Sequence, residues 1–168
     1  IELMITLVIM AVVLAVGIPS FQAMLRENRL AAQTNAFLTA LNLARSEAIK
    51  RGRRVTLCAS ADGATCAGDD GYQQGWIVFV DASNPVGATK PTVDPGDVVL
   101  RVYEGLPGGM KLTGNTLVKW YVSFTSDGLS RLLGGGFQAG TLELCAAPKA
   151  RLIVINSMGR ARVAEAGC

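Results

Sequence analysis

The distribution of hydrophobic and polar residues divides the chain into three parts. From Leu3 to Leu25 there are 23 residues without a charge, and about 20 such residues let a helix cross the hydrocarbon core of a bilayer. A buried helix of a soluble protein is rarely apolar on every side over this length, and a cleaved signal peptide would have a shorter apolar core. Residues 1–25 are therefore expected to lie in lipid or against other copies of the same helix.

The pattern of an amphipathic helix follows over residues 26–51. Its apolar residues recur at steps of four, three and four, which forms one stripe on a helix. They are Phe37, Leu41, Ala44 and Ala48. Lys50 and Arg51 precede Gly52, and cations followed by a glycine are typical of a helix C-terminus. We predict one helix from about Glu2 to Arg51, whose second half packs on a domain.

Residues 52–168 have the pattern of short β-strands. Runs rich in β-branched and aromatic residues are separated by Gly, Pro, Asp and Asn. These runs are 54–60, 75–81, 98–103, 119–124, 141–145 and 151–156, with 160–163 as a further candidate. Six or seven strands, expected to be antiparallel, packed against one helix indicate the α+β class. Residues 82–97 and 134–140 are predicted to be surface loops.

Three residues stand out within the apolar first part. A proline inside a helix removes one backbone hydrogen bond, so Gly17 and Pro19 are predicted to kink or loosen the helix. Glu2 is an acid at the tip of an apolar run. A charge in apolar surroundings is unfavourable unless it is paired, which makes Glu2 a candidate functional residue. An ordinary membrane anchor with an incidental acid is the alternative.

The composition of the chain excludes several kinds of catalytic and metal-binding site. The net charge is +3, which is too small to imply nucleic-acid binding by itself, and the chain has no histidine. The absence of histidine excludes Ser-His-Asp and Cys-His catalysis and His-ligated zinc. We therefore expect no enzymatic activity, cofactor or metal. Asp62, Asp69 and Asp70 do not match the spacing of an EF-hand loop and favour a polar loop.

The four cysteines contain no Cys-x-x-Cys pair, which argues against a zinc ribbon or a thioredoxin-like site. An even number behind a hydrophobic N-terminus indicates disulfides and an oxidising compartment. Three pairings are possible. We favour the sequence-local ones, Cys58 with Cys66 and Cys145 with Cys168.

The N-terminal sequence I-E-L-M-I-T-L-V-I-M, followed by G-I-P-S-F-Q, resembles type IV pilins and type II secretion pseudopilins. In that family a prepilin peptidase cleaves after a glycine, and the mature chain begins with a methylated phenylalanine. The resemblance implies three mature residues before Ile1 and a pilin fold. It also implies that Glu2 pairs with the terminal amine of a neighbouring subunit. The expected location is the inner membrane, with a periplasmic domain, and then the extracellular pilus.

Four further segments resemble the GspH/FimT group. They are residues 43–51, 75–81, 124–128 and 155–162. The group contains FimT and FimU minor pilins and the minor pseudopilin GspH. The resemblance implies a minor type IV pilin that takes part in pilus assembly or initiation together with major and minor pilins. A GspH-type minor pseudopilin of type II secretion is the main alternative, and a major pilin is another.

The segment G-R-A-R is the strongest candidate for a binding site. In a strand, Arg160 and Arg162 would point to the same side, and arginine forks suit phosphate oxygens. The segment resembles the G-R-x-R motif of FimT-type pilins, which is associated with binding double-stranded DNA for natural transformation. The resemblance implies Gly159, Arg160 and Arg162 as DNA-binding residues, and we add Lys149 and Arg151 for their proximity in the sequence. A turn glycine followed by solvated arginines is the alternative.

A second basic cluster consists of Lys50, Arg51, Arg53 and Arg54. Compensation of the helix dipole and a solvated turn are the plain interpretation. A supporting contact with phosphate or a lipid headgroup is the alternative.

Overall fold

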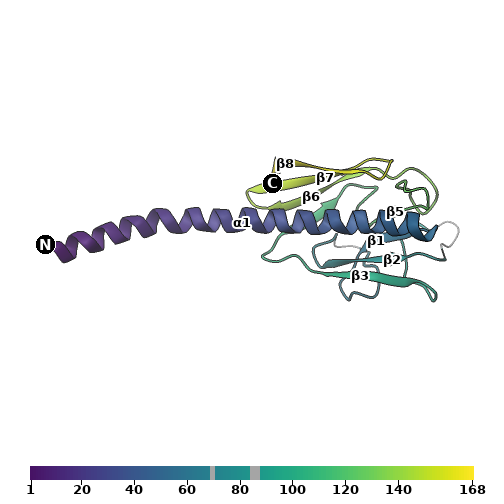
Figure 1. Ribbon diagram of the computed structural model, residues 1–168, viewed down its shortest axis with the longest axis horizontal. Helices are drawn as coiled ribbons and strands as arrows, with labels where there is room; N and C mark the ends of the chain where they lie inside the picture. Colours follow the sequence, from purple (N-terminus) through teal and green to yellow (C-terminus); the bar gives the residue numbers. More distant parts are fainter. Residues whose placement is uncertain (69–70, 84–87) are drawn as a thin grey trace.

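The computed structural model describes residues 1–68, 71–83 and 88–168 (Figure 1). A single helix, α1 (Glu2–Arg51), has the predicted bounds and is the longest element of the molecule. Gly52 ends it in the left-handed conformation, with φ of 63°, which glycine adopts without strain. The second half of α1 lies against the β domain, and the first half projects from it (Figure 1).

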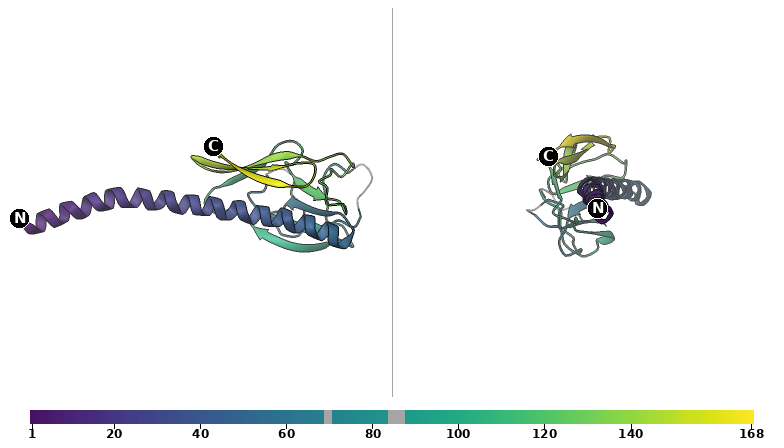
Figure 2. Two further views of the ribbon diagram at one scale, coloured as in Figure 1. Left: turned by 45° about the horizontal axis from the view of Figure 1, so that its top comes forward. Right: turned by 90° about the vertical axis from the view of Figure 1, so that its left-hand side faces the viewer.

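The projecting half of α1 is continuous through Gly17 and Pro19. Pro19 has no N–H, so the carbonyl of Ala15 cannot form its helical hydrogen bond. The helix curves gently over this half without a break (Figure 2). Loosening of the helix at the two residues stays a prediction.

The described residues contain eight strands in two antiparallel sheets, where the sequence pattern predicts six or seven. The first sheet has the order β3-β2-β1-β5 and the second β4-β6-β7-β8. The strands are β1 (Val55–Ala59), β2 (Gly75–Val80), β3 (Val98–Glu104), β4 (Lys111–Gly114), β5 (Tyr121–Phe124), β6 (Gly140–Ala146), β7 (Lys149–Ile155) and β8 (Ala161–Gly167). The strand that no predicted run covers is β4.

The core lies between α1 and the two sheets, which flank the helix on different sides (Figure 1). All four residues of the predicted stripe are 2% exposed or less. The ring of Phe37 packs edge-on against Tyr72 and Trp76, with both centroids 5.2 Å away. Burial of each large apolar side chain stabilises the fold by about 1.5–3 kcal/mol. The second half of α1 is therefore part of the domain.

Two disulfides close loops of the domain, Cys58–Cys66 and Cys145–Cys168. Within the first loop, the carboxylate of Asp62 accepts hydrogen bonds from the backbone N–H groups of Ala64 and Thr65. Its role is thus to order the loop. The second disulfide ties the C-terminus to β6, beside the middle of α1 (Figure 1). The predictions for Asp69 and Asp70, and for residues 84–87 of the Pro-rich loop, lie outside the described residues.

Candidate nucleic-acid interface

The candidate site is the turn between β7 and β8. The backbone N–H of Asn156 donates to the carbonyl of Arg160, and the side-chain oxygen of Asn156 accepts from the N–H of Arg160. Gly159 has φ of 72°, and a Cβ there would lie 2.5 Å from the carbonyl oxygen of Gly128. Both the conformation and the close approach therefore require glycine at this position.

The register of the hairpin directs Arg162 to the outer face of its sheet. Ile153 is buried in the core and lies opposite Val163. Residues opposite each other in an antiparallel pair share a face, and neighbours along a strand alternate between faces. Arg162 is the neighbour of Val163 and so points away from the core. Arg160 lies one residue before β8 and is exposed as well.

The side chains of Arg160 and Arg162 make no hydrogen bond or ion pair with any residue that the structure describes. Both arginines are exposed. Their donors are therefore available to an external anion, and the planar guanidinium can bind two oxygens of one phosphate.

Lys149 and Arg151 have different surroundings. The Nζ of Lys149 lies 2.5 Å from Glu27 of α1, and a guanidinium nitrogen of Arg151 lies 2.7 Å from the same carboxylate. Arg151 also lies 2.9 Å from Glu165, its partner on β8. Hydrogen bonds from Lys149 and then Arg151 hold the pKa of Glu27 below its usual range. The structure thus places these two residues in the contact between α1 and the sheet, apart from the outer face of Arg162.

Three of the segments that resemble the GspH/FimT group meet beside the hairpin turn. The Nε–H of Arg45 in α1 donates to the carbonyl of Gly128 at 3.0 Å. This is the same oxygen that Gly159 approaches. The N–H of Ser130 donates to the carbonyl of Ser157 in the turn. The sequence analysis did not single out Arg45, although this residue lies within residues 43–51, one of the segments that resemble the group.

The second basic cluster does not form one free patch. Lys50 and Arg51 pair with Glu47, at 3.6 and 2.5 Å. Arg54 donates to the hydroxyl of Ser123 at 2.6 Å, and burial lowers its pKa. Arg53 is exposed and makes no polar side-chain contact within the described parts of the chain. Most of this cluster therefore has structural partners.

The projecting half of α1 is long and apolar enough to cross a membrane. An 18-residue window has a mean hydropathy of 2.5, and none of it is buried. Glu2 lies in its first turn and is exposed, where an acid interacts favourably with the helix dipole. The predicted pairing of Glu2 with a neighbouring subunit concerns a contact between chains and stays a prediction.

A long apolar helix that continues into an antiparallel β domain places the chain among pilin-like proteins. Residues 33–159 match the family model of the type II transport protein GspH, and the chain belongs to this family. The resemblance to the GspH/FimT group is thereby confirmed.

Solved structures agree on the fold. The chain is similar to a crystal structure of the type IV minor pilin FimU of Pseudomonas aeruginosa PAO1. The TM-score is 0.58 and the identity 22%, over 82% of this chain and 90% of that chain. A second crystal form of FimU gives 0.55 and 22%, over 80% and 92%. No curated protein matches the chain.

Proposed function

We propose that the chain is a minor type IV pilin that waits in the inner membrane and then joins a pilus with other pilin subunits. The apolar first half of α1 supports this role, because it buries no part of its membrane-length window within its own domain. The pilin fold and membership of the GspH family support it as well. Maturation by a prepilin peptidase and pairing of Glu2 with a neighbouring amine belong to the same proposal, as does a part in pilus initiation.

The proposal extends to binding double-stranded DNA for natural transformation. Arg160 and Arg162 are the proposed contacts, and Gly159 shapes the turn that carries them. This part of the proposal rests on one observation. Both guanidiniums are exposed, and neither has a hydrogen-bond or ion-pair partner among the described residues. Such contacts go to phosphates and do not depend on base sequence. Lys149 and Arg151 are the weaker part of the proposal, because Glu27 already binds both.

The test uses a soluble chain that begins at Arg26, because Leu30 is the first residue whose side chain the structure describes as buried. Fluorescence anisotropy with a labelled duplex at low salt measures affinity. We expect Arg160→Gln/Arg162→Gln to weaken binding about tenfold or more, as the loss of charge-assisted hydrogen bonds implies.

The control variant Arg101→Gln/Lys119→Gln removes the same charge from two exposed residues that lie outside the β7–β8 hairpin. It should retain the affinity of the unaltered chain. Equal binding by the Arg160/Arg162 variant and the unaltered chain would reject the proposed site.

A minor pseudopilin of type II secretion is the second candidate function. The match to the GspH family favours it, because this family is named for a type II transport protein. Deletion of the gene separates the two functions. Loss of protein export with normal transformation and twitching would support the pseudopilin, and the reverse result would support the minor pilin.

A further inference from the structure

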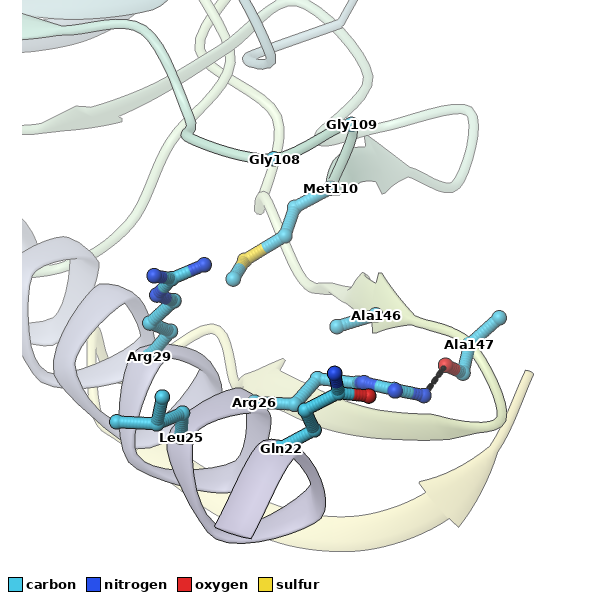
Figure 3. A pocket seen from close by; sticks show the side chains of 9 residues that line it. All are labelled: Gln22, Leu25, Arg26, Arg29, Gly108, Gly109, Met110, Ala146 and Ala147. Carbon is cyan, nitrogen blue, oxygen red and sulfur yellow. Dashed lines mark hydrogen bonds between the residues drawn. The ribbon is translucent and has the colours of Figure 1, made fainter. Parts of the chain in front are cut away.

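A cleft of about 560 Å³ opens where α1 enters the domain. The helix lines one wall, and the loop before β4 and the turn between β6 and β7 line the other (Figure 3). From the helix come Gln22, Leu25, Arg26 and Arg29. The opposite wall includes Gly108 and Gly109, where an added Cβ would meet nothing within 4 Å. This wall therefore leaves room for a ligand headgroup.

Two arginines supply the charge of the cleft. Arg26 donates to the carbonyl of Ala147 at 3.0 Å, which holds its guanidinium across the opening (Figure 3). The side chain of Arg29 reaches into the same space, toward Met110 (Figure 3). Its guanidinium makes no hydrogen bond or ion pair with the described residues.

This positive charge is not compensated locally. Among the described residues, no acid lines the cleft. The nearest acid along the helix is Glu27, whose carboxylate binds Lys149 and Arg151 at 2.5 and 2.7 Å. An anion in the cleft would therefore meet both guanidiniums without a competing carboxylate.

The position of the cleft along α1 indicates where such an anion comes from. The run without charges ends at Leu25, which lines the cleft itself. At about 1.5 Å per residue the run is roughly 35 Å long, close to the roughly 30 Å of a hydrocarbon core. With this run in a bilayer, Arg26 and Arg29 lie at the level of the lipid headgroups.

We propose that the cleft binds the headgroup phosphate of an anionic phospholipid in the membrane that holds α1. Arg26 and Arg29 contact the phosphate oxygens, for which the guanidinium fork is well suited. Leu25, at the end of the charge-free run, contacts the upper part of the acyl chains. Basic pockets beside a membrane helix are suited to anionic headgroups. This inference rests on the proposed membrane anchoring of residues 1–25 and is independent of DNA binding.

Native mass spectrometry of the full chain in detergent, with equal amounts of phosphatidylglycerol and phosphatidylcholine, tests the site. Both lipids carry the phosphate, but phosphatidylcholine also carries a cationic choline, which the two guanidiniums repel. We therefore expect the unaltered chain to bind phosphatidylglycerol about tenfold more, the scale of one charge interaction near a protein surface. Arg26→Gln/Arg29→Gln should remove this preference. Arg53→Gln, at the other end of the helix, should keep it. Equal binding of the two lipids by the unaltered chain would overturn the inference.

A matched pair of variants separates the cleft from the general charge of the helix. Gln22→Glu and Asn28→Glu each add one negative charge to the same segment of α1, but only Gln22 lines the cleft. We expect the preference for phosphatidylglycerol to fall in Gln22→Glu and to persist in Asn28→Glu. An equal fall in both variants would contradict a site in the cleft.

Two further measurements distinguish a lipid headgroup from free phosphate, and distinguish failure of membrane anchoring from failure of the lipid site. Inorganic phosphate in excess should leave the lipid bound, and its displacement of the lipid would contradict a lipid site. Flotation with vesicles tests membrane insertion. If the unaltered chain does not float, the anchoring and this inference both fail. If it floats without a lipid preference, only this inference fails.

Discussion

The two ends of the β7–β8 hairpin each carry a pair of basic residues in contrasting surroundings. At the end near the C-terminus, Lys149 and Arg151 share the carboxylate of Glu27. At the turn, Arg160 and Arg162 are exposed and make no polar side-chain contact within the described residues. The difference arises because α1 passes along the inner face of the sheet, whereas Arg162 points to the outer face. Basic residues close in sequence can thus have different surroundings. One pair holds α1 against the sheet, and the other is exposed to solvent.

The largest effect on stability is expected at the turn that positions the exposed pair. Gly159→Ala should lower the free energy of unfolding by about 2–3 kcal/mol, because a side chain at positive φ is strained and its Cβ would meet the carbonyl of Gly128. Urea unfolding of the chain that begins at Arg26 measures the change. Gly134→Ala is the control, since a Cβ there meets nothing within 4 Å. It should change stability by no more than about 1 kcal/mol, and equal changes in both variants would contradict the strained turn.

The salt dependence of DNA binding tests the contrast between the two basic pairs directly. Two phosphate contacts predict a slope of log affinity against log salt near −2, at about −0.9 for each contact. Arg160→Gln/Arg162→Gln should bring the slope close to zero. Lys149→Gln/Arg151→Gln should leave it almost unchanged, because Glu27 already neutralises part of that charge. Anisotropy over a salt series measures the slope. An equal loss of slope in both variants would show that the two basic pairs contribute equally to DNA binding.

Glu27→Gln tests whether Lys149 and Arg151 can bind DNA once their shared carboxylate is removed. Lys149 and Arg151 would lose their shared carboxylate, and the local charge would become more positive. We expect DNA affinity to rise on the order of threefold, the scale of one exposed charge interaction. Thermal stability should fall, because α1 loses contacts with the sheet. Unchanged affinity would mean that these two residues lie too far from bound DNA to contribute even when free.

The smallest effect is expected in the pH dependence of stability. The folded chain lowers the pKa of Glu27 from its ordinary value of 4.5, first through the hydrogen bond from Lys149. A lowered pKa gives stability that is present above the ordinary value and is lost as pH falls through the folded value.

The unaltered chain should therefore lose more thermal stability than Glu27→Gln between about pH 6 and pH 3. Other acids titrate in both chains, so the difference between the two melting curves isolates Glu27. Parallel curves over this range would show that the ion pairs contribute nothing measurable.

Local patterns in the sequence were enough to predict the helix and most of the strands, because the periods of these elements depend on neighbouring residues. The charge-free run and the stripe from Phe37 to Ala48 predicted α1 with its observed bounds. Alternation and turn residues predicted six of the eight strands, and the further candidate at 160–163 corresponds to β8. The sequence also contained the G-R-A-R segment, but a motif alone does not show whether its arginines are free.

Which basic residues have partners depends on contacts between segments that lie far apart in the sequence. Glu27 lies 122 residues from Lys149 in the sequence, and Arg45 lies 83 residues from the carbonyl of Gly128 that it binds. These contacts depend on strand register and on the path of α1, and a shift of one residue would exchange the two faces of a strand. The division into two sheets, the strand β4 and the arginine-lined cleft arise in the same way, the cleft at the end of the domain from which the first half of α1 projects. They are made by segments distant in sequence, which no local pattern brings together.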